Sequence, residues 1–226
     1  MAAAPLIRPA AAPGLWRLRR RPVCASTEIE LDRWLAELDG QPQLERSGLV
    51  VVARRQRHGR GQWQRQWQSP PGGLWLSAAF AWPGEPATEL APLTLATAVG
   101  LALQLEALGV APQIKWPNDL MLQGRKLAGI LARQRLQGGR VRWARVGVGL
   151  NGINRVPAGA IALGEVLPHA PHSHYNPRAS AAALLPRVLA ALHWAQRHAK
   201  QPELVQQLAQ ARLLNPSDGW PRRDGD

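Results

Sequence analysis

A cation, an amide and a carboxylate lie within five positions in Lys115-Trp116-Pro117-Asn118-Asp119, at the end of a predicted strand. The carboxylate of Asp119 could hold a hydrated magnesium ion or cap the turn. Lys126 begins the next predicted strand, in which Ala128 and Gly129 leave room for a ligand near the backbone. The chain has only three lysines among its 28 basic residues. We therefore favour a ligand-binding role for Lys126 over a solvated charge at a strand end.

A second candidate is the segment 56–67, which reads QRHGRGQWQRQW. Glycines allow backbone amides to approach an anion, and arginines offer several donors to a phosphate. The same segment could be a solvated basic loop. It could also bind single-stranded nucleic acid, with Trp63 and Trp67 as stacking platforms. These alternatives stay open at this point.

A third candidate is a strand with alternate glycines, Gly147 and Gly149, that runs into a turn at Asn151. The dinucleotide fingerprint needs its glycines between a strand and a helix, so this pattern is not that motif. It favours a bulged strand or a strand that faces a ligand.

The elements that must position these residues follow from hydrophobic periodicity and turn signals. Ser26 or Thr27 can cap the first helix, and the segment 54–73 interrupts regular structure as a long functional loop. The predicted helices are 27–38, 88–108, 179–198 and 202–214, and the predicted strands are 49–53, 74–82, 113–116, 126–133 and 141–150. This order predicts an α+β domain, with helices packed on a mixed or antiparallel β-sheet. We assign 1–22 to a disordered basic arm, 23–214 to the domain and 215–226 to a polar tail.

Composition limits the class of protein. The 226 residues are 46% hydrophobic and 19% charged, as in a globular domain, and no apolar run approaches the ~20 residues of a spanning helix. The single cysteine excludes an intrachain disulfide framework and favours a cytoplasmic protein. His169, His172 and His174 lie among prolines, so we interpret them as a loop and not as a metal site. The net charge of +13 indicates a phosphate or nucleic-acid partner, or only a compositional bias.

The order and spacing of these stretches resemble the catalytic domain of biotin protein ligase. The resemblance extends over 24–214. Its matching positions are Ser26-Thr27, Gln56, Gly59-Arg60-Gly61, Trp67, Ser69-Pro70, Leu76-Ser77, 115–120, 124–131 and 147–151. It implies the biotin/lipoate protein ligase catalytic-domain fold.

The resemblance also implies a two-step reaction with biotin, ATP and Mg²⁺. The biotin carboxylate first attacks the α-phosphate of ATP to give biotinyl-5′-AMP and pyrophosphate. A lysine of a biotin carboxyl carrier protein, that of acetyl-CoA carboxylase, then attacks the mixed anhydride. Such chemistry requires positioning and charge neutralisation more than a covalent protein intermediate.

Residue roles follow from the resemblance alone. Lys126, Arg60 and Lys115 are the implied catalytic residues, and Lys126 contacts the biotin carboxylate and the α-phosphate. The implied biotin-binding residues are Ser26, Thr27, Gln56, Gly59, Arg60, Gly61, Lys126 and Gly129. The implied ATP or adenylate residues are Arg65, Lys115, Asn118, Asp119 and Asn151, and Asp119 is the implied magnesium ligand.

Three positions depart from the family pattern. Members commonly have arginine at the position of Gln62, glycine at that of Gln64 and asparagine at that of Glu28. The missing loop arginine leads to the hypothesis that this protein releases biotinyl-5′-AMP, or that Arg65 or Arg57 substitutes for it.

The resemblance also sets expectations for domains and partners. We expect no winged helix-turn-helix before Ser26 and hence no specific DNA binding, and we expect the small C-terminal β-barrel of most bacterial members to be missing. A homodimer is compatible with the family, and no membrane partner is expected. The alternatives are a lipoate or octanoate transferase on the same fold, a non-catalytic biotin-binding module, or a basic nucleic-acid-binding module.

Overall fold

The computed structural model describes residues 16–38, 48–81, 90–137, 140–168 and 176–214. The predicted histidine loop and the polar tail lie outside these residues. The strands are β1 (Trp16–Cys24), β2 (Gly48–Arg60), β3 (Gln66–Ser69), β4 (Leu74–Ala81), β5 (Gln113–Lys115), β6 (Asp119–Leu122), β7 (Arg125–Gln137) and β8 (Arg140–Leu150). The helices are α1 (Thr27–Glu37), α2 (Leu90–Glu106), α3 (Ala181–His198) and α4 (Pro202–Gln210).

All eight strands form one mixed sheet in the order β1-β2-β4-β8-β7-β6-β5, and β3 pairs with β2. β1 and β2 are parallel, and the other pairs are antiparallel. The two-residue connection between β6 and β7 uses the left-handed region: Gln123 and Gly124 have φ of 51° and 71°. The α+β class and the mixed sheet that the sequence predicts are confirmed.

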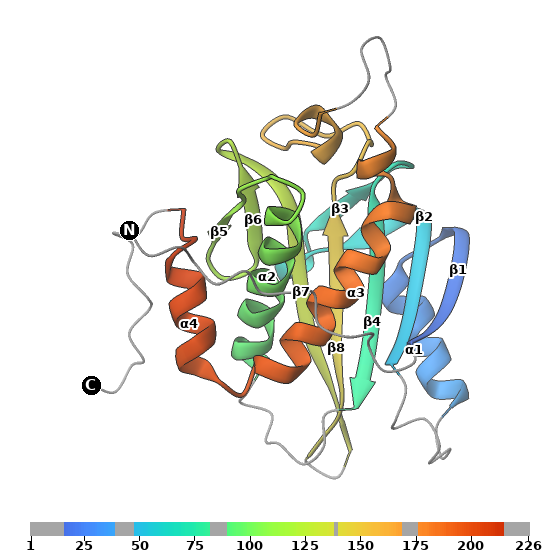
Figure 1. Ribbon diagram of the computed structural model, residues 1–226. Helices are drawn as coiled ribbons and strands as arrows, with labels where there is room; N and C mark the ends of the chain where they lie inside the picture. Colours follow the sequence, from blue (N-terminus) through green and yellow to red (C-terminus); the bar gives the residue numbers. More distant parts are fainter. Residues whose placement is uncertain (1–15, 39–47, 82–89, 138–139, 169–175, 215–226) are drawn as a thin grey trace.

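Helices cover the two faces of the sheet unequally (Figure 1). α2 and α3 lie on one face, where Leu76, Val99 and Val148 belong to the main apolar core with residues of both helices. α1 lies on the opposite face, where Trp34 packs in a smaller cluster with Val51 of β2. Because α1 is short, it covers only part of its face, and the remaining part is available for a ligand.

The prediction of a disordered arm over 1–22 is wrong for residues 16–22, which belong to β1. They pair in parallel with β2, with Trp16 opposite Gly48 and Cys24 opposite Gln56. The arginines of this segment suggested disorder, but at the edge of a sheet most of these side chains can stay in solvent while the backbone pairs. Residues 1–15 lie outside the described part of the chain.

The predicted loop over 54–73 is wrong in most of its length. β2 continues to Arg60, a short 3₁₀ helix covers Gln62–Gln64, and β3 follows. Polar, mostly exposed side chains hide this hairpin from a hydrophobic pattern. The sequence also missed β6, whose four residues complete the antiparallel series β5-β6-β7-β8. The remaining predicted strands and helices are confirmed, with shifted ends.

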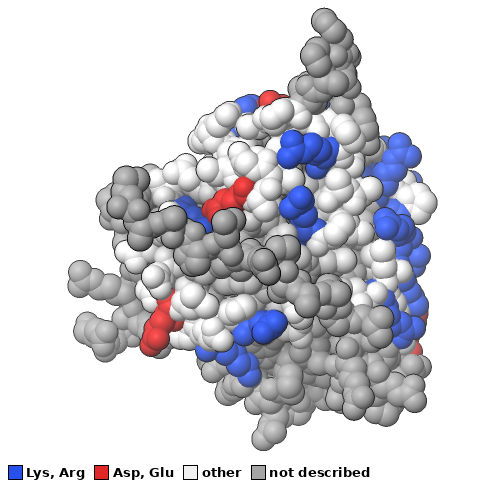
Figure 2. Space-filling view, viewed as in Figure 1, with Lys and Arg blue, Asp and Glu red and all other residues white. Residues whose placement is uncertain are grey.

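Basic side chains gather along the edge of the sheet that β1 forms (Figure 2). Two of them pair with acids of α1, Arg19 with Glu37 and Arg21 with Glu30, both at 2.8 Å. Among the described residues, no helix combines the length and the apolar character that crossing a membrane requires.

The reactivity of the Cys24 thiol tests whether the end of β1 is buried as the structure shows. Burial, and next the charge of Glu30, raise the pKa of the Cys24 thiol from 9.0 to about 11. The stability that this shift contributes is present below the unfolded pKa and is lost as pH rises through the folded pKa. At pH 8, a difference of two pKa units lowers the thiolate fraction about 100-fold. We expect a disulfide reagent to label Cys24 at least that much more slowly in the native protein than in urea.

The control for this measurement is Cys24→Ala, which removes the only cysteine and must abolish labelling. Equal labelling rates in native and unfolded protein would mean that this end of β1 is open to solvent, contrary to the structure.

Candidate active site

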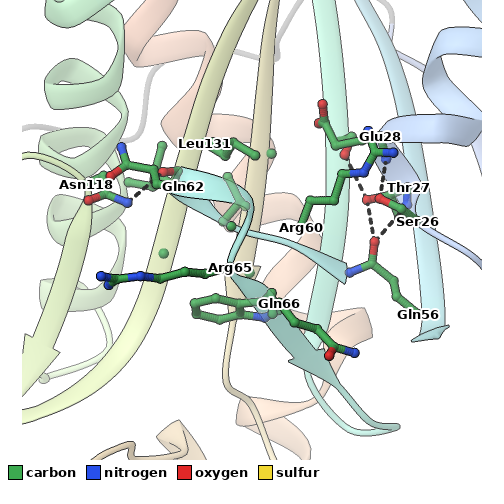
Figure 3. A pocket seen from close by; sticks show the side chains of 18 of the residues that line it. Ser26, Thr27, Glu28, Gln56, Arg60, Gln62, Arg65, Gln66, Asn118 and Leu131 are labelled. Carbon is green, nitrogen blue, oxygen red and sulfur yellow. Dashed lines mark hydrogen bonds between the residues drawn. The ribbon is translucent and has the colours of Figure 1, made fainter. Parts of the chain in front are cut away.

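A hollow lies on the α1 face of the sheet, where the central strands carry small residues. Gly147 of β8 pairs with Ser77 of β4 on one side and with Leu131 of β7 on the other, and Gly149 pairs with Gly129. With so little side-chain volume, these strands leave a cavity of about 270 Å³ beside the N-terminus of α1. Figure 3 shows the side chains that converge on it from α1, β2 and the following loop.

Trp67 of β3 forms one wall of this cavity, and the glycines make room for it. A Cβ atom at Gly149 would lie 2.5 Å from the Trp67 indole, and one at Gly129 would lie 2.7 Å from it. Gly59 allows β2 to approach the carbonyl of Trp67. The amino group of Lys126 lies 5.1 Å from the centre of the indole, a cation-π distance. Trp67 therefore shapes the cavity and also stabilises one of its cations, Lys126.

The closed side of the cavity carries a connected polar network. The backbone N–H and the hydroxyl of Thr27 donate to Gln56 Oε1, at 2.7 and 3.0 Å. Because the Thr27 hydroxyl has one proton, Ser77 donates the 2.8 Å bond between the two hydroxyls. Gln56 Nε2 donates to Ser69 at 2.8 Å. The network fixes Thr27 and Gln56 in positions from which both donors and acceptors border the cavity.

Lys126 and Asp119 form an ion pair at the opposite side, with 2.7 Å between Nζ and Oδ2. The β6–β7 hairpin brings them together, and the second oxygen of Asp119, Oδ1, is buried without a hydrogen-bond partner. That oxygen can accept a bond from a bound group or coordinate a cation. Within the described residues no group of three or more His, Cys, Asp or Glu side chains could hold a metal without help from a ligand.

The loop after β2 closes the cavity with cationic and aromatic side chains. Arg60, Arg65 and Trp63 line it, and Trp63 is 86% exposed with a left-handed φ of 55°. Two backbone bonds hold the loop, from Gly61 N–H to the Arg65 carbonyl at 2.8 Å and from Arg65 N–H to the Gln62 carbonyl at 3.0 Å. In Figure 3, Arg65 extends to the side where Asn118 lies, opposite Thr27 and Gln56.

A buried ion pair lies under the α1 side of the cavity. Glu28, which is 4% exposed, accepts a bond of 3.1 Å from Arg145 of β8. Arg145 is 8% exposed and also pairs with Asp32 of α1 at 2.7 Å. Glu28 lies in the first turn of α1, where a negative charge is favourable. Ser26 caps this helix by accepting a bond from the Glu28 N–H.

The structure brings most of the predicted site residues around one cavity, namely Ser26, Thr27, Gln56, Arg60, Gly61, Arg65, Asn118, Asp119, Lys126 and Gly129. It places three others outside the cavity lining. Lys115 is exposed at the end of β5, and Gly59 lies behind Trp67. Asn151 is buried, where it donates to the carbonyl of Lys126 and accepts a bond from Asn154. Asn151 therefore supports the Lys126 backbone.

Sequence reasoning missed Glu28 as part of the cavity wall and Leu131 as its neighbour. A signal for Glu28 was present. Arg145 interrupts an apolar strand, and a buried cation requires a buried acid close by. Nothing in the sequence identified Leu131, because an apolar residue in a strand is equally typical of the core.

Comparison with known proteins now decides the family. Residues 27–151, more than half of the chain, match the biotin/lipoate A/B protein ligase family. The chain belongs to this family. The biotin/lipoate ligase match begins at Thr27 and ends at Asn151, so it includes every residue that lines the cavity except Ser26 and leaves out β1, α3 and α4.

Named relatives are biotin ligases. The chain is 39% identical over 112 residues to the bifunctional ligase/repressor BirA of Bacillus subtilis, which covers 49% of this chain and 34% of the relative. It is 36% identical over 124 residues to the biotin–[acetyl-CoA-carboxylase] ligase of Paracoccus denitrificans, which covers 52% of this chain and 50% of the relative. The chain thus spans between a third and a half of these two proteins.

Among solved structures, the biotin protein ligase of Aquifex aeolicus in complex with biotin and ATP has a TM-score of 0.67. The two chains are 24% identical, and the match covers 87% of this chain and 78% of the other. This likeness confirms the biotin/lipoate protein ligase catalytic-domain fold that the sequence predicts.

The polar network predicts a cost for removing Gln56. Gln56→Leu leaves the buried N–H of Thr27 without its acceptor, so we expect the free energy of unfolding to fall by about 1–3 kcal/mol. Urea denaturation measures the change. The matched control is Gln66→Leu on β3, because Gln66 is exposed and donates only a 3.4 Å bond to a carbonyl. A loss of the same size in both variants would contradict a special role for the network.

Proposed function

We propose that this protein attaches biotin to a lysine of a biotin carrier protein in an ATP-dependent reaction through biotinyl-5′-AMP. The observation that carries the proposal is the division of the cavity. A network of donors and acceptors around Thr27 and Gln56 lies on one side, and the Lys126 cation lies on the other. A ureido ring needs both donors and acceptors, and a carboxylate needs a cation.

In the first step, a carboxylate oxygen of biotin attacks the α-phosphorus of ATP and the bond to pyrophosphate breaks. Negative charge gathers on the carboxylate and the phosphoryl oxygens as they approach. Lys126 neutralises part of this charge, and the exposed guanidinium group of Arg65 extends to the side of the cavity where Asn118 lies, while Arg60 lies near Glu28 and Thr27. The protein forms no covalent bond in this step.

In the second step, the amine of the carrier lysine attacks the acyl carbon of the adenylate and AMP leaves. Lys126 again stabilises the charge on the departing phosphate. Trp67 covers Gly129 and Gly149 and so limits water beside the anhydride. The carrier must reach the cavity past the loop that holds Trp63.

The residues of this cavity could hold Mg²⁺ only if ATP supplied further ligands to the ion. The buried, unpartnered Oδ1 of Asp119 can accept a bond from the ion or from its water. When bound, Mg²⁺ neutralises charge on the phosphates. Asn118 lies beside the same edge of the cavity, while Lys115 and Asn151 remain predicted ATP or adenylate residues.

The names of the relatives support biotin and ATP as substrates, and one relative supports the carrier of acetyl-CoA carboxylase as the acceptor. We propose the same substrates for this chain because its cavity has hydrogen-bond donors and acceptors on one side and a cation on the other. A cytoplasmic location rests on the single cysteine, and a homodimer and the absence of DNA binding stay predictions. No contact in the cavity favours lipoate or octanoate, whose apolar ends would leave the Thr27 network without a ligand partner.

Lys126→Ala tests the proposed reaction. Removing a cation that acts in both steps should lower the rate of ATP-dependent biotin transfer to a purified carrier domain about 100-fold or more. Transfer of labelled biotin is measured with magnesium and ATP. Lys200→Ala, which removes an exposed lysine beyond α3, is the control and should keep the wild-type rate. Biotin transfer that survives in Lys126→Ala would exclude the proposed role of this residue.

The loop composition predicts how tightly the adenylate is held. Arg65 lines the cavity and Arg57 does not, so Arg65 is the residue that can substitute for the arginine absent at Gln62. A charge-assisted bond is worth roughly tenfold in affinity or more. We expect Arg65→Gln to speed the release of biotinyl-5′-AMP by about that factor and Gln62→Arg to slow it.

Release is measured with purified adenylate in the absence of carrier, and labelling of a bystander protein provides a second readout. Arg57→Gln removes an exposed arginine of β2 outside the cavity and should leave release unchanged. Identical release from all three variants would show that the loop charges do not retain the adenylate.

A further inference from the structure

Glu28 has one carboxylate oxygen that the chain does not use. Oε2 accepts the 3.1 Å bond from Arg145, whereas Oε1 is buried without any hydrogen-bond partner. Such an oxygen is costly to leave unpaired in a residue that is only 4% exposed. None of the three cations that line the cavity, Arg60, Arg65 and Lys126, supplies a bond to it.

The oxygen faces the cavity across Gly147. A Cβ atom built on Gly147 would lie 3.2 Å from Oε1 and 3.6 Å from the Cβ of Leu131. Glu28, Leu131 and Gly147 all line the cavity, and Gly147 has no side chain to separate the oxygen from it. Oε1 therefore lies in the part of the wall that Gly147 and Leu131 form, where it is the acceptor that has no partner within the chain.

Arg145 fixes which oxygen faces the cavity. Its Nη2 bonds both the carboxylate and the backbone carbonyl of Glu28, and its Nη1 bonds Asp32. Since a guanidinium only donates, the oxygen facing Arg145 must stay an acceptor. The ion pair thus holds the side chain in one orientation and leaves Oε1 for a ligand.

We propose that Glu28 Oε1 is a specificity-determining acceptor that binds an N–H donor in the ring of the ligand. The inference rests on the proposed function, in which that donor is a ureido N–H of biotin. An acid whose ring or tail lacks such a donor would leave Oε1 buried and unpaired. A site built around a buried polar group rejects a ligand that cannot satisfy it.

Glu28→Gln tests the proposal with almost no change in volume. The Gln carbonyl must face Arg145, so the amide NH₂ faces the cavity and replaces an acceptor with a donor. We expect biotin affinity, measured by calorimetry without ATP, to fall roughly tenfold or more. Thermal unfolding of the variant reports separately on its stability.

An analogue of biotin methylated on both ureido nitrogens separates ligand recognition from a structural effect. The wild type should prefer biotin over this analogue, and the preference should shrink roughly tenfold in Glu28→Gln because the acceptor is gone. A steric penalty from the methyl groups, or a general disturbance of the cavity, would leave the preference equal in the two proteins. An equal preference would overturn the proposal.

Asp32→Asn is the matched control. It changes the other carboxylate bonded to Arg145, but Asp32 does not line the cavity and its side chain is 48% exposed. Biotin affinity should stay within about twofold of the wild type. A loss as large as that of Glu28→Gln would assign the effect to the Arg145 ion pair and overturn the proposal. Failure of the wild type itself to bind biotin would instead contradict the proposed function.

Discussion

The site depends on the absence of side chains at three positions on one face of two central strands, β7 and β8. Gly129, Gly147 and Gly149 leave a volume that any Cβ atom would reduce, and at Gly129 and Gly149 that atom would collide with Trp67. The opposite face of the same strands is filled by the main core, where Ile130 and Val148 are almost completely buried. The cavity thus has a rigid floor, because the α2 and α3 side of the sheet is closely packed.

The N-terminus of α1 connects the strands around that floor. Three consecutive residues perform three tasks: Ser26 caps the helix, Thr27 bonds Gln56 of β2 and Ser77 of β4, and Glu28 bonds Arg145 of β8. Each bond is buried or partly buried, so moving the helix would break several polar contacts together. The first turn of α1 consequently links several strands and also forms a wall of the cavity. Its position determines the geometry of the polar network.

Much of this arrangement could be predicted from the sequence, because the helices and buried strands have strong apolar periodicity and the glycine, lysine and asparagine motifs lie at their ends. What failed has a common physical cause. β1 and the β2–β3 hairpin are rich in exposed arginine and glutamine, and their pairing depends on backbone bonds that leave no hydrophobic pattern. The Glu28–Arg145 pair joins residues 117 positions apart. Only the packing of α1 on the sheet brings them together, and single-sequence reasoning has no access to that packing.

Charge is distributed unequally between the two sides of the cavity. A buried acid lies on the α1 side, and Lys126 and Arg65 supply positive charge elsewhere on the lining. An elongated acid that entered with its carboxylate toward Glu28 would bring two negative charges together where water is excluded, which is strongly unfavourable. The reverse orientation places the carboxylate near Lys126 and the ring near Thr27 and Glu28. The distribution of charge thus favours, together with the Thr27 network, the orientation in which the reacting oxygen of the proposed substrate lies beside Lys126.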